Sequence, residues 1–243
     1  MPKVVAIIQA RMGSSRLHGK VMKDLFGKPV LSHDIERIKQ ASAIDEIVVA
    51  TTLSDEDDII VRQAFKDGVK IYRGSENNVL SRYYQAGMEF SADVVVRITS
   101  DCPLIDPNIA DEVINFYLNN DYDLVTNAGL YVENRTYPRG LDLEVFSIKS
   151  LKEAYENAKK DYQLEHVTPY IYENSDKIFY YKNSKDESKH RWTLDTEEDF
   201  ELIKAIYGDL YKGVHNFYLD DILNLFNKKP ELFYINSHIE QKK

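Results

Sequence analysis

A positively charged loop follows the first apolar run of the chain. The segment 9–20 reads Gln-Ala-Arg-Met-Gly-Ser-Ser-Arg-Leu-His-Gly-Lys and contains three cations, Arg11, Arg16 and Lys20. Arginine and lysine donate charge-assisted hydrogen bonds to phosphate oxygens, and glycines such as Gly13 and Gly19 let backbone N–H groups approach those oxygens closely. The loop is therefore predicted to hold a polyphosphate. The alternative is an ordinary strand-to-helix turn whose basic residues are solvated.

Two aspartates are expected at the same edge of the fold. Asp101 follows a run rich in Val and Ile, and Asp195 follows a short predicted strand. Ligands of open parallel sheets bind at the carboxyl ends of the strands, and paired carboxylates beside a phosphate loop suit Mg²⁺. Asp195, with Glu198 three residues later, also fits a helix capping box. Asp101 also fits a simple turn, because Pro103 follows it.

Four other polar residues are weaker candidates. Arg73, followed by Gly-Ser, has the groups to read the edge of a base, although a turn with a Ser or Asn helix cap explains the same residues. His166 lies in a predicted helix, where histidines are more often packed or at the surface. Asp142 and Glu144 alternate along a predicted strand and share one face, which is either solvent or the rim of a site.

The composition narrows the class of protein. The chain has 243 residues, a formal net charge of -9 and one cysteine, Cys102. The acidic balance argues against a general nucleic-acid partner, and one cysteine excludes an intrachain disulfide. No apolar run is long enough to cross a bilayer, so no membrane association is expected. These features favour a globular protein of the reducing cytoplasm.

The hydrophobic pattern predicts an α/β fold with a mainly parallel sheet. Nearly continuous apolar runs predict strands buried on both faces, at 3–9, 46–51, 93–98 and 123–126, with shorter strands at 70–73, 141–146, 178–182 and 191–194. Helical spacing predicts helices at 30–41, 55–66, 78–90, 148–159, 164–173, 196–207 and 220–226, and another that begins at Asp106-Pro107. The long connection 128–140 has no clear period and is expected to be a lid or an interface arm.

The motifs together resemble the cytidylyltransferases that make CMP-activated acidic sugars, and more closely the spore-coat polysaccharide biosynthesis SpsF branch. The resemblance rests on segments in family order: the loop 9–20, then Tyr-Arg-Gly-Ser at 72–75, Arg-Ile-Thr-Ser-Asp-Cys-Pro-Leu-Ile at 97–105, Gly-Leu-Asp-Leu-Glu-Val-Phe at 140–146, Glu-His-Val-Thr-Pro-Tyr at 165–170 and Arg-Trp-Thr-Leu-Asp-Thr at 191–196. Three positions depart from the family pattern. His18 replaces a usual proline, Ser100 replaces a usual glycine, and Thr99 stands near the position where the acidic-sugar enzymes have a glutamine that helps to read the base.

The resemblance implies a three-layer, Rossmann-like nucleotide-diphospho-sugar transferase fold in one domain, residues 1–243. An inserted arm at about 128–175 is expected to approach the acceptor and a second subunit of a homodimer. The resemblance also implies which residues contact the ligands. Those for CTP are Ala10, Arg11, Met12, Gly13, Ser14, Arg16, Lys20, Arg73, Thr99 and Asp101, and those for Mg²⁺ are Asp101 and Asp195. Apart from the resemblance, Asp142, Glu144 and His166 are the candidates for the acceptor side, where one of them would serve as the base that a hydroxyl acceptor needs.

The expected reaction is transfer of CMP from CTP to a sugar or a phosphorylated small molecule, with release of pyrophosphate. Lys20, Arg16 and Arg11 would stabilise the triphosphate and the departing pyrophosphate. A glycosyltransferase that consumes a nucleotide sugar is an alternative, although it has less need of the basic loop. A non-catalytic nucleotide-binding module is the other alternative, because fold alone does not fix function.

Overall fold

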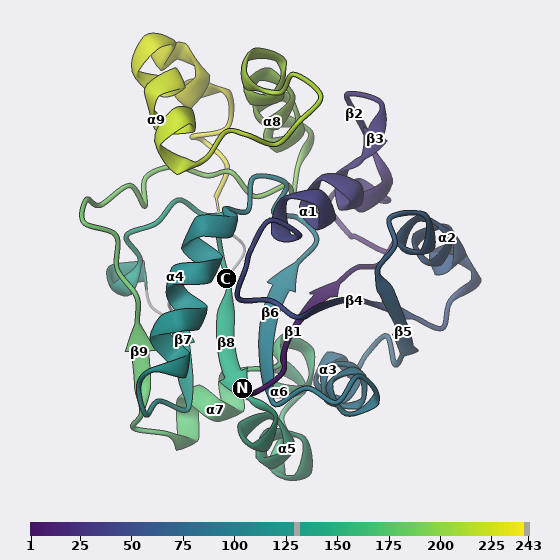
Figure 1. The fold of residues 1–243 in the computed structure, drawn as a ribbon. Helices are drawn as coiled ribbons and strands as arrows, with labels where there is room; N and C mark the ends of the chain where they lie inside the picture. The colour runs from purple at the N-terminus through teal and green to yellow at the C-terminus, as the bar shows by residue number, and fades with distance from the viewer. Residues whose placement is uncertain (129–131, 241–243) are drawn as a thin grey trace.

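The computed structural model describes residues 1–128 and 132–240. In these residues a seven-stranded sheet has the order β5-β4-β1-β6-β8-β7-β9 (Figure 1). The strands are β1 (Val4–Gln9), β4 (Glu46–Thr52), β5 (Lys70–Gly74), β6 (Val94–Thr99), β7 (Leu124–Thr126), β8 (Glu144–Ser147) and β9 (Ile178–Tyr180). All neighbouring pairs are parallel except those of β8 with β6 and β7. The predicted mainly parallel α/β fold is confirmed.

Helices cover both faces of the sheet, because alternate residues of each buried strand point to opposite sides. Along β1, Val5 and Ile7 join one apolar core, and Val4, Ala6 and Ile8 join the other. The first core is covered by α3 (Val79–Glu89), α5 (Ile148–Asn157), α6 (Asp161–His166) and α7 (Pro169–Asn174). The second is covered by α1 (Val30–Ile38), α2 (Asp58–Lys66), α4 (Pro107–Leu118), α8 (Glu197–Leu210) and α9 (Leu219–Lys228). Short elements complete the chain: η1 (Lys20–Met22), β2 (Asp24–Leu25), β3 (Lys28–Pro29), η2 (Asp55–Asp57), η3 (Val132–Asn134) and η4 (Pro230–Ile235).

Two predicted strands and one predicted helix are corrected. The strand expected at 141–146 begins only at Glu144, because the side chain of Asn127 binds the backbone of Leu141 and Leu143 in place of a neighbouring strand. The segment 191–194 is no strand: it joins other loops through a single β-bridge. The helix expected at 164–173 is two helices, α6 and α7, separated by Val167 and Thr168.

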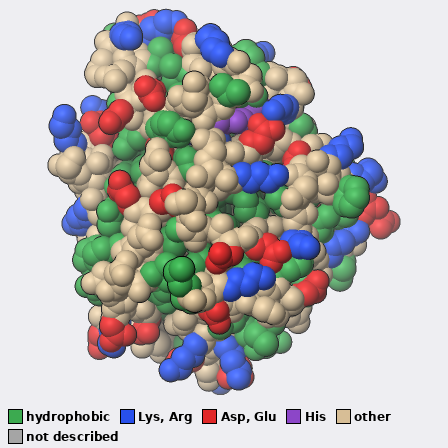
Figure 2. Space-filling model, in the orientation of Figure 1, with side chains coloured by type: hydrophobic (Ala, Val, Ile, Leu, Met, Phe, Trp, Pro, Cys, Tyr) green, Lys and Arg blue, Asp and Glu red, His purple; other side chains and the backbone are tan. Residues whose placement is uncertain are grey.

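The segment expected to form an arm, 128–175, is largely part of the layered body. It supplies β8 to the sheet, and α5 and α6 pack against α3 (Figure 1). Residues 129–131 of that prediction lie outside the described residues. Among the described residues, no helix combines the length and apolarity needed to cross a membrane. Figure 2 shows acidic and basic side chains interspersed over one face of the molecule.

Three histidines are buried: His33 of α1 and His215 lie against α8, and His190 lies against α9. Nδ1 of His33 lies 2.9 Å from Nε2 of His215, and the His33 ring packs against Tyr207. His190 packs edge-on against Phe226. Burial lowers the pKa of His33, lowers that of His215 to about 3 and lowers that of His190 to about 4. All three are therefore neutral in the folded protein near pH 7.

The fold should lose stability in mild acid, because the unfolded chain protonates these histidines near pH 6.5 while the folded protein does not. Between about pH 6.5 and 4 the unfolded state binds more protons, so the free energy of unfolding falls as the pH falls. Urea unfolding at pH 7.5 and pH 5 measures this difference. His190→Leu should reduce the difference.

The matched control is the exposed histidine His238. His238→Gln should keep the full difference between the two pH values. Equal unfolding midpoints at pH 7.5 and pH 5 in the unaltered protein would contradict this account of the buried histidines.

Candidate functional site

Two cavities lie beside each other at the carboxyl ends of β1 and β6. The strand-end cavity has a volume of about 260 Å³ and is lined by Gln9, Ala10, Arg11, Ser14, Ser15, Arg16, Lys20, Val21, Val79, Arg82, Thr99, Ser100, Asp101, Glu165, His166 and Asp195. The arm cavity has a volume of about 490 Å³ and is lined by Arg97, Thr99, Ala128, Arg139, Asp142, Leu143, Glu144, Tyr162, His166, Thr168, Pro169, Tyr172 and Glu173. Thr99 and His166 line both, so the two cavities meet at these residues.

The basic loop after β1 is folded by its own backbone. The carbonyl of Met12 accepts hydrogen bonds from the N–H groups of Ser14, at 2.7 Å, and Gly19, at 2.9 Å. The N–H of Met12 donates to Asp57, at 2.7 Å. Gly19 has a φ of 65°, a conformation that favours glycine, and it immediately precedes Lys20. The turn at Gly19 therefore fixes where the Lys20 side chain begins.

The ammonium group of Lys20 joins the two aspartates that the sequence singles out. Its Nζ donates to Asp101 Oδ2 and to Asp195 Oδ1, each at 2.8 Å, and to the carbonyl of Leu194, at 2.7 Å. Arg16 forms an ion pair with the other oxygen of Asp195, at 2.8 Å. Residues far apart in the sequence thus place two carboxylates and two cations around one point.

The electrostatics of this cluster stabilise its charged forms. Burial opposes the charge on Lys20, but attraction to Asp101 and Asp195 outweighs it, so the pKa of Lys20 is raised. Burial alone would raise the pKa of Asp101, but the same ammonium group reverses the effect and lowers it. Lys20 is therefore positively charged and Asp101 negatively charged at neutral pH.

The carboxylate of Asp195 is not a helix cap. The N-cap of α8 is Thr196, whose side chain and backbone exchange hydrogen bonds with Asp199. The capping box is therefore formed by Thr196 and Asp199, and the alternative that predicted it at Asp195 and Glu198 is wrong. The guanidinium of Arg191 forms ion pairs with Asp195, at 3.1 Å, and with Asp199, at 2.8 Å. Arg191 is not among the lining residues of the strand-end cavity, so it orients the side chain of Asp195 from the side away from the cavity.

The structure brings most of the predicted nucleotide-binding residues to the strand-end cavity. Six of the predicted residues line it with Lys20 and Asp195, namely Ala10, Arg11, Ser14, Arg16, Thr99 and Asp101. Met12 and Gly13 are in the loop but are not among the lining residues. Gly13 has an ordinary backbone, and a Cβ there would meet Glu76 at 3.6 Å, so that position does not require glycine. His18 is exposed outside the cavity, whereas Ser100 is part of its wall.

Arg73 is not brought to the cavity. Its guanidinium donates to Asp58, at 2.6 Å, and to the carbonyls of Thr52 and Ser54, both at 2.8 Å. Asn78 caps α3 through the N–H of Ser81, as the simpler alternative for this segment expects. The strand β5 that carries Arg73 lies at the edge of the sheet, and this placement explains why it does not reach the cavity.

The three predicted acceptor residues all line the arm cavity, but two of them are already engaged. Asp142 forms a two-point ion pair with Arg135. Glu144 is buried and forms an ion pair with Arg97, at 2.6 Å. His166 is exposed at the junction of the two cavities. The acidic pair therefore shapes the wall, while the histidine remains accessible.

Several lining residues are not predicted from the sequence, and four polar ones among them are Arg82, Glu165, Ser15 and Arg139. Arg82 is buried in α3, and Glu165, Ser15 and Arg139 line the cavities from separate segments. Arg82 sits at an ordinary position of an amphipathic helix, so its sequence context gives no sign of a site. Only the packing of α3 against β1 reveals that this cation borders the cavity.

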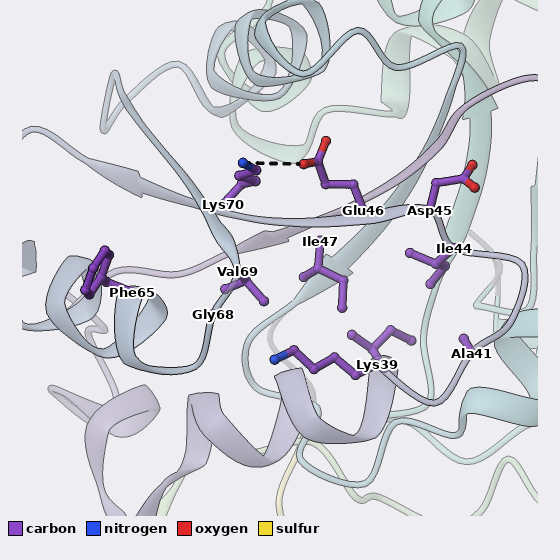
Figure 3. Close-up of a pocket in the computed structure, with 11 residues that line it drawn as sticks. Lys39, Ala41, Ile44, Asp45, Glu46, Ile47, Phe65, Gly68, Val69 and Lys70 are labelled. Atoms are coloured by element: carbon purple, nitrogen blue, oxygen red, sulfur yellow. Dashed lines mark ion pairs between the residues drawn. The ribbon is translucent and has the colours of Figure 1, made fainter.

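A further cavity, of about 550 Å³, lies at the amino ends of β4 and β5, on the opposite side of the sheet from the carboxyl ends that line the strand-end cavity (Figure 3). Its polar groups include Lys70 and Glu46, whose charged atoms are 3.9 Å apart. Phe65 at its margin is 79% exposed. None of the predicted site residues lines this cavity, so its larger volume does not make it the candidate site.

Basic side chains and paired carboxylates at the carboxyl ends of parallel strands suit a phosphorylated ligand and a divalent cation. The family model described as cytidylyltransferase matches residues 5–239. The chain therefore belongs to the cytidylyltransferase family and is a CTP-dependent nucleotidyltransferase.

Known proteins similar to the chain match it over nearly its full length. An uncharacterized protein of Methanocaldococcus jannaschii is 40% identical over 99% of this chain and 97% of its own. The spore coat polysaccharide biosynthesis protein SpsF of Bacillus subtilis is 31% identical over 95% of this chain and 97% of its own. The structure of a cytidylyltransferase from Leptospira borgpetersenii has a TM-score of 0.90 and 34% identity, with full coverage of both chains.

Gly140 should be essential for docking the segment that carries Asp195. Its φ is 100°, and a Cβ there would lie 2.5 Å from the backbone carbon of Trp192. Gly140→Ala should therefore lower the free energy of unfolding by clearly more than the about 1–2 kcal/mol that a left-handed alanine costs. It should also weaken CTP binding. Urea unfolding and calorimetric titration with CTP measure the two effects.

Gly213 provides the matched control, because it has a φ of 90° and a Cβ added there would meet no atom within 4 Å. Gly213→Ala should show only the conformational cost and should bind CTP normally. If the two variants lose the same stability, close packing at Gly140 is not what positions the segment.

Proposed function

We propose that this cytidylyltransferase transfers CMP from CTP to a sugar or a phosphorylated small-molecule acceptor and releases pyrophosphate. The observation that carries the proposal is the convergence of Lys20 and Arg16 on Asp101 and Asp195 in a cavity that opens onto a second one. A triphosphate fits the first cavity by charge, and the second provides space for an acceptor. The similarity to SpsF supports a place in cell-surface polysaccharide synthesis.

The cations of the strand-end cavity would hold the phosphates. Lys20, Arg16 and Arg11 each form an ion pair with a carboxylate of the protein, and Arg82 lies beside them. A bound triphosphate would compete for these cations, because phosphate oxygens are strong acceptors of charge-assisted hydrogen bonds. Ala10 and Thr99 at the strand ends, with Ser14 in the loop, would contact the remainder of the nucleotide.

Asp101 and Asp195 have the donor chemistry for Mg²⁺. Both carboxylates place an oxygen 2.8 Å from the same Lys20 nitrogen, so they can approach one cation together. Among the described residues no group of three or more His, Cys, Asp and Glu side chains could hold a metal. Two carboxylates suit Mg²⁺ nonetheless, since this ion keeps waters and binds substrate phosphates. When bound, it would neutralise charge on the phosphates.

The chain's own contribution to catalysis would be positioning and charge stabilisation, which dominate phosphoryl transfer. The acceptor in the arm cavity would approach past Thr99 and His166 towards the α-phosphate. Lys20 and Arg16 would stabilise the negative charge that develops on the departing pyrophosphate. The engaged pairs Arg97–Glu144 and Arg135–Asp142 would keep the acceptor side rigid.

The test is pyrophosphate release from CTP and Mg²⁺ with a panel of sugars and sugar phosphates. Asp101→Asn should lower turnover by about 10²-fold or more while the protein stays folded, because it removes a charge from the site rather than from the core. Asp121→Asn, at an exposed surface position, should leave turnover unchanged. The proposal fails if no acceptor releases pyrophosphate, and CTP binding without turnover would then favour a non-catalytic nucleotide-binding module.

A further inference from the structure

The backbone at Val167 is strained. Its φ of 72° and ψ of -56° lie in a region that a β-branched residue rarely adopts. The N–H of Thr168 donates to the carbonyl of His166 at 2.9 Å, so the three residues form a tight γ-turn. Strain of this kind costs about 1–3 kcal/mol and is concentrated at functional sites.

Buried contacts hold the turn in place. The Val167 side chain is fully buried in the core beneath α3. The hydroxyl of Thr168 donates to both carboxylate oxygens of Glu144, at 3.0 and 3.1 Å. Tyr172 donates to Glu144 as well, at 2.8 Å. Glu144 is therefore an anchor for the turn, and its oxygens are saturated by donors.

The strained turn places His166 at the junction of the two cavities. His166 is the last residue of α6, and of the described residues it lines both cavities together with Thr99. The side chain is exposed, and its ring has no hydrogen bond or ion pair with any other residue in the described ranges 1–128 and 132–240. Both ring nitrogens are thus available to a ligand that spans the cavities.

The carboxylates that line the arm cavity are engaged by other side chains of the protein. Glu173 accepts hydrogen bonds from Tyr162 and Gln163. Asp142 is bound at two points by Arg135, and Glu144 is bound by Arg97 and by the turn itself. The oxygens of Asp142 and Glu144 therefore already accept hydrogen bonds from the protein. Among the described residues that line both cavities, His166 has an accessible ring that could accept a proton.

We propose that His166 is the general base that activates a hydroxyl group of the acceptor. This inference rests on the proposed function and makes the nucleophile an alcohol rather than a phosphate, which is already ionised. The acceptor O–H bond breaks and its proton passes to an imidazole nitrogen of His166. The oxygen bonds to the α-phosphorus of CTP, and the bond to the β-phosphate oxygen breaks, so pyrophosphate leaves with the electron pair.

The test compares His166→Ala and His166→Gln with the unaltered enzyme and its best acceptor. General bases contribute about 10²–10⁴-fold, so kcat should fall in that range while the KM for CTP changes little. Added imidazole should restore part of the activity of His166→Ala, because the exposed position admits a free base. His238→Gln, another exposed histidine, should keep full activity and gain nothing from imidazole.

The outcomes separate the two proposals. If the unaltered protein releases no pyrophosphate with any acceptor, the proposed function fails. If it is active and both His166 variants keep their kcat, the assignment of His166 is overturned. A loss of kcat in folded His166→Ala that imidazole does not restore also overturns the assignment as a base. Turnover of the acceptor only through a phosphate group would overturn the alcohol nucleophile.

Discussion

The contact of one ammonium group with two carboxylates and a carbonyl organises the candidate site. Lys20 follows the basic loop after β1, Asp101 follows β6, and Asp195 precedes α8. The ammonium group of Lys20 therefore joins three regions of the chain. Two negative charges in a partly buried cavity repel each other strongly unless a cation lies between them. The same charges make the cavity suitable for a metal ion and a triphosphate, which bring charges of both signs.

The second requirement is a rigid support for the carboxylates and for the acceptor side. Arg191 forms ion pairs with Asp195 and Asp199, and the N–H of Asp195 donates to Asp199. Asn236, near the end of the chain, also donates to Asp199, at 2.8 Å. On the other side, Glu144 holds the turn that carries His166. Cytidylyl transfer needs few covalent steps from the protein, so a site built mainly on fixed charges is consistent with this chemistry.

The sequence predicts the sheet and the charged residues Lys20 and Asp101, but it does not predict the contacts between distant segments that position the site. Continuous Val and Ile runs and the basic loop are local signals, and both Asp101 and Lys20 follow from them. Arg82 and the left-handed Val167 depend on packing between distant segments, which no local pattern encodes. Arg73 resembles a base-reading residue in sequence, but its guanidinium binds Asp58 instead. The N-cap Thr196 differs by one residue from the predicted cap.

A crystal structure with CTP and Mn²⁺ tests the central claim most directly, since the anomalous signal of Mn²⁺ locates the metal. We expect Lys20 to move its Nζ from Asp101 and Asp195 to the phosphate oxygens, and the metal to take its place between the carboxylates. CTP bound in another cavity, or Lys20 still bridging both carboxylates with the nucleotide in place, would contradict this role of the cluster.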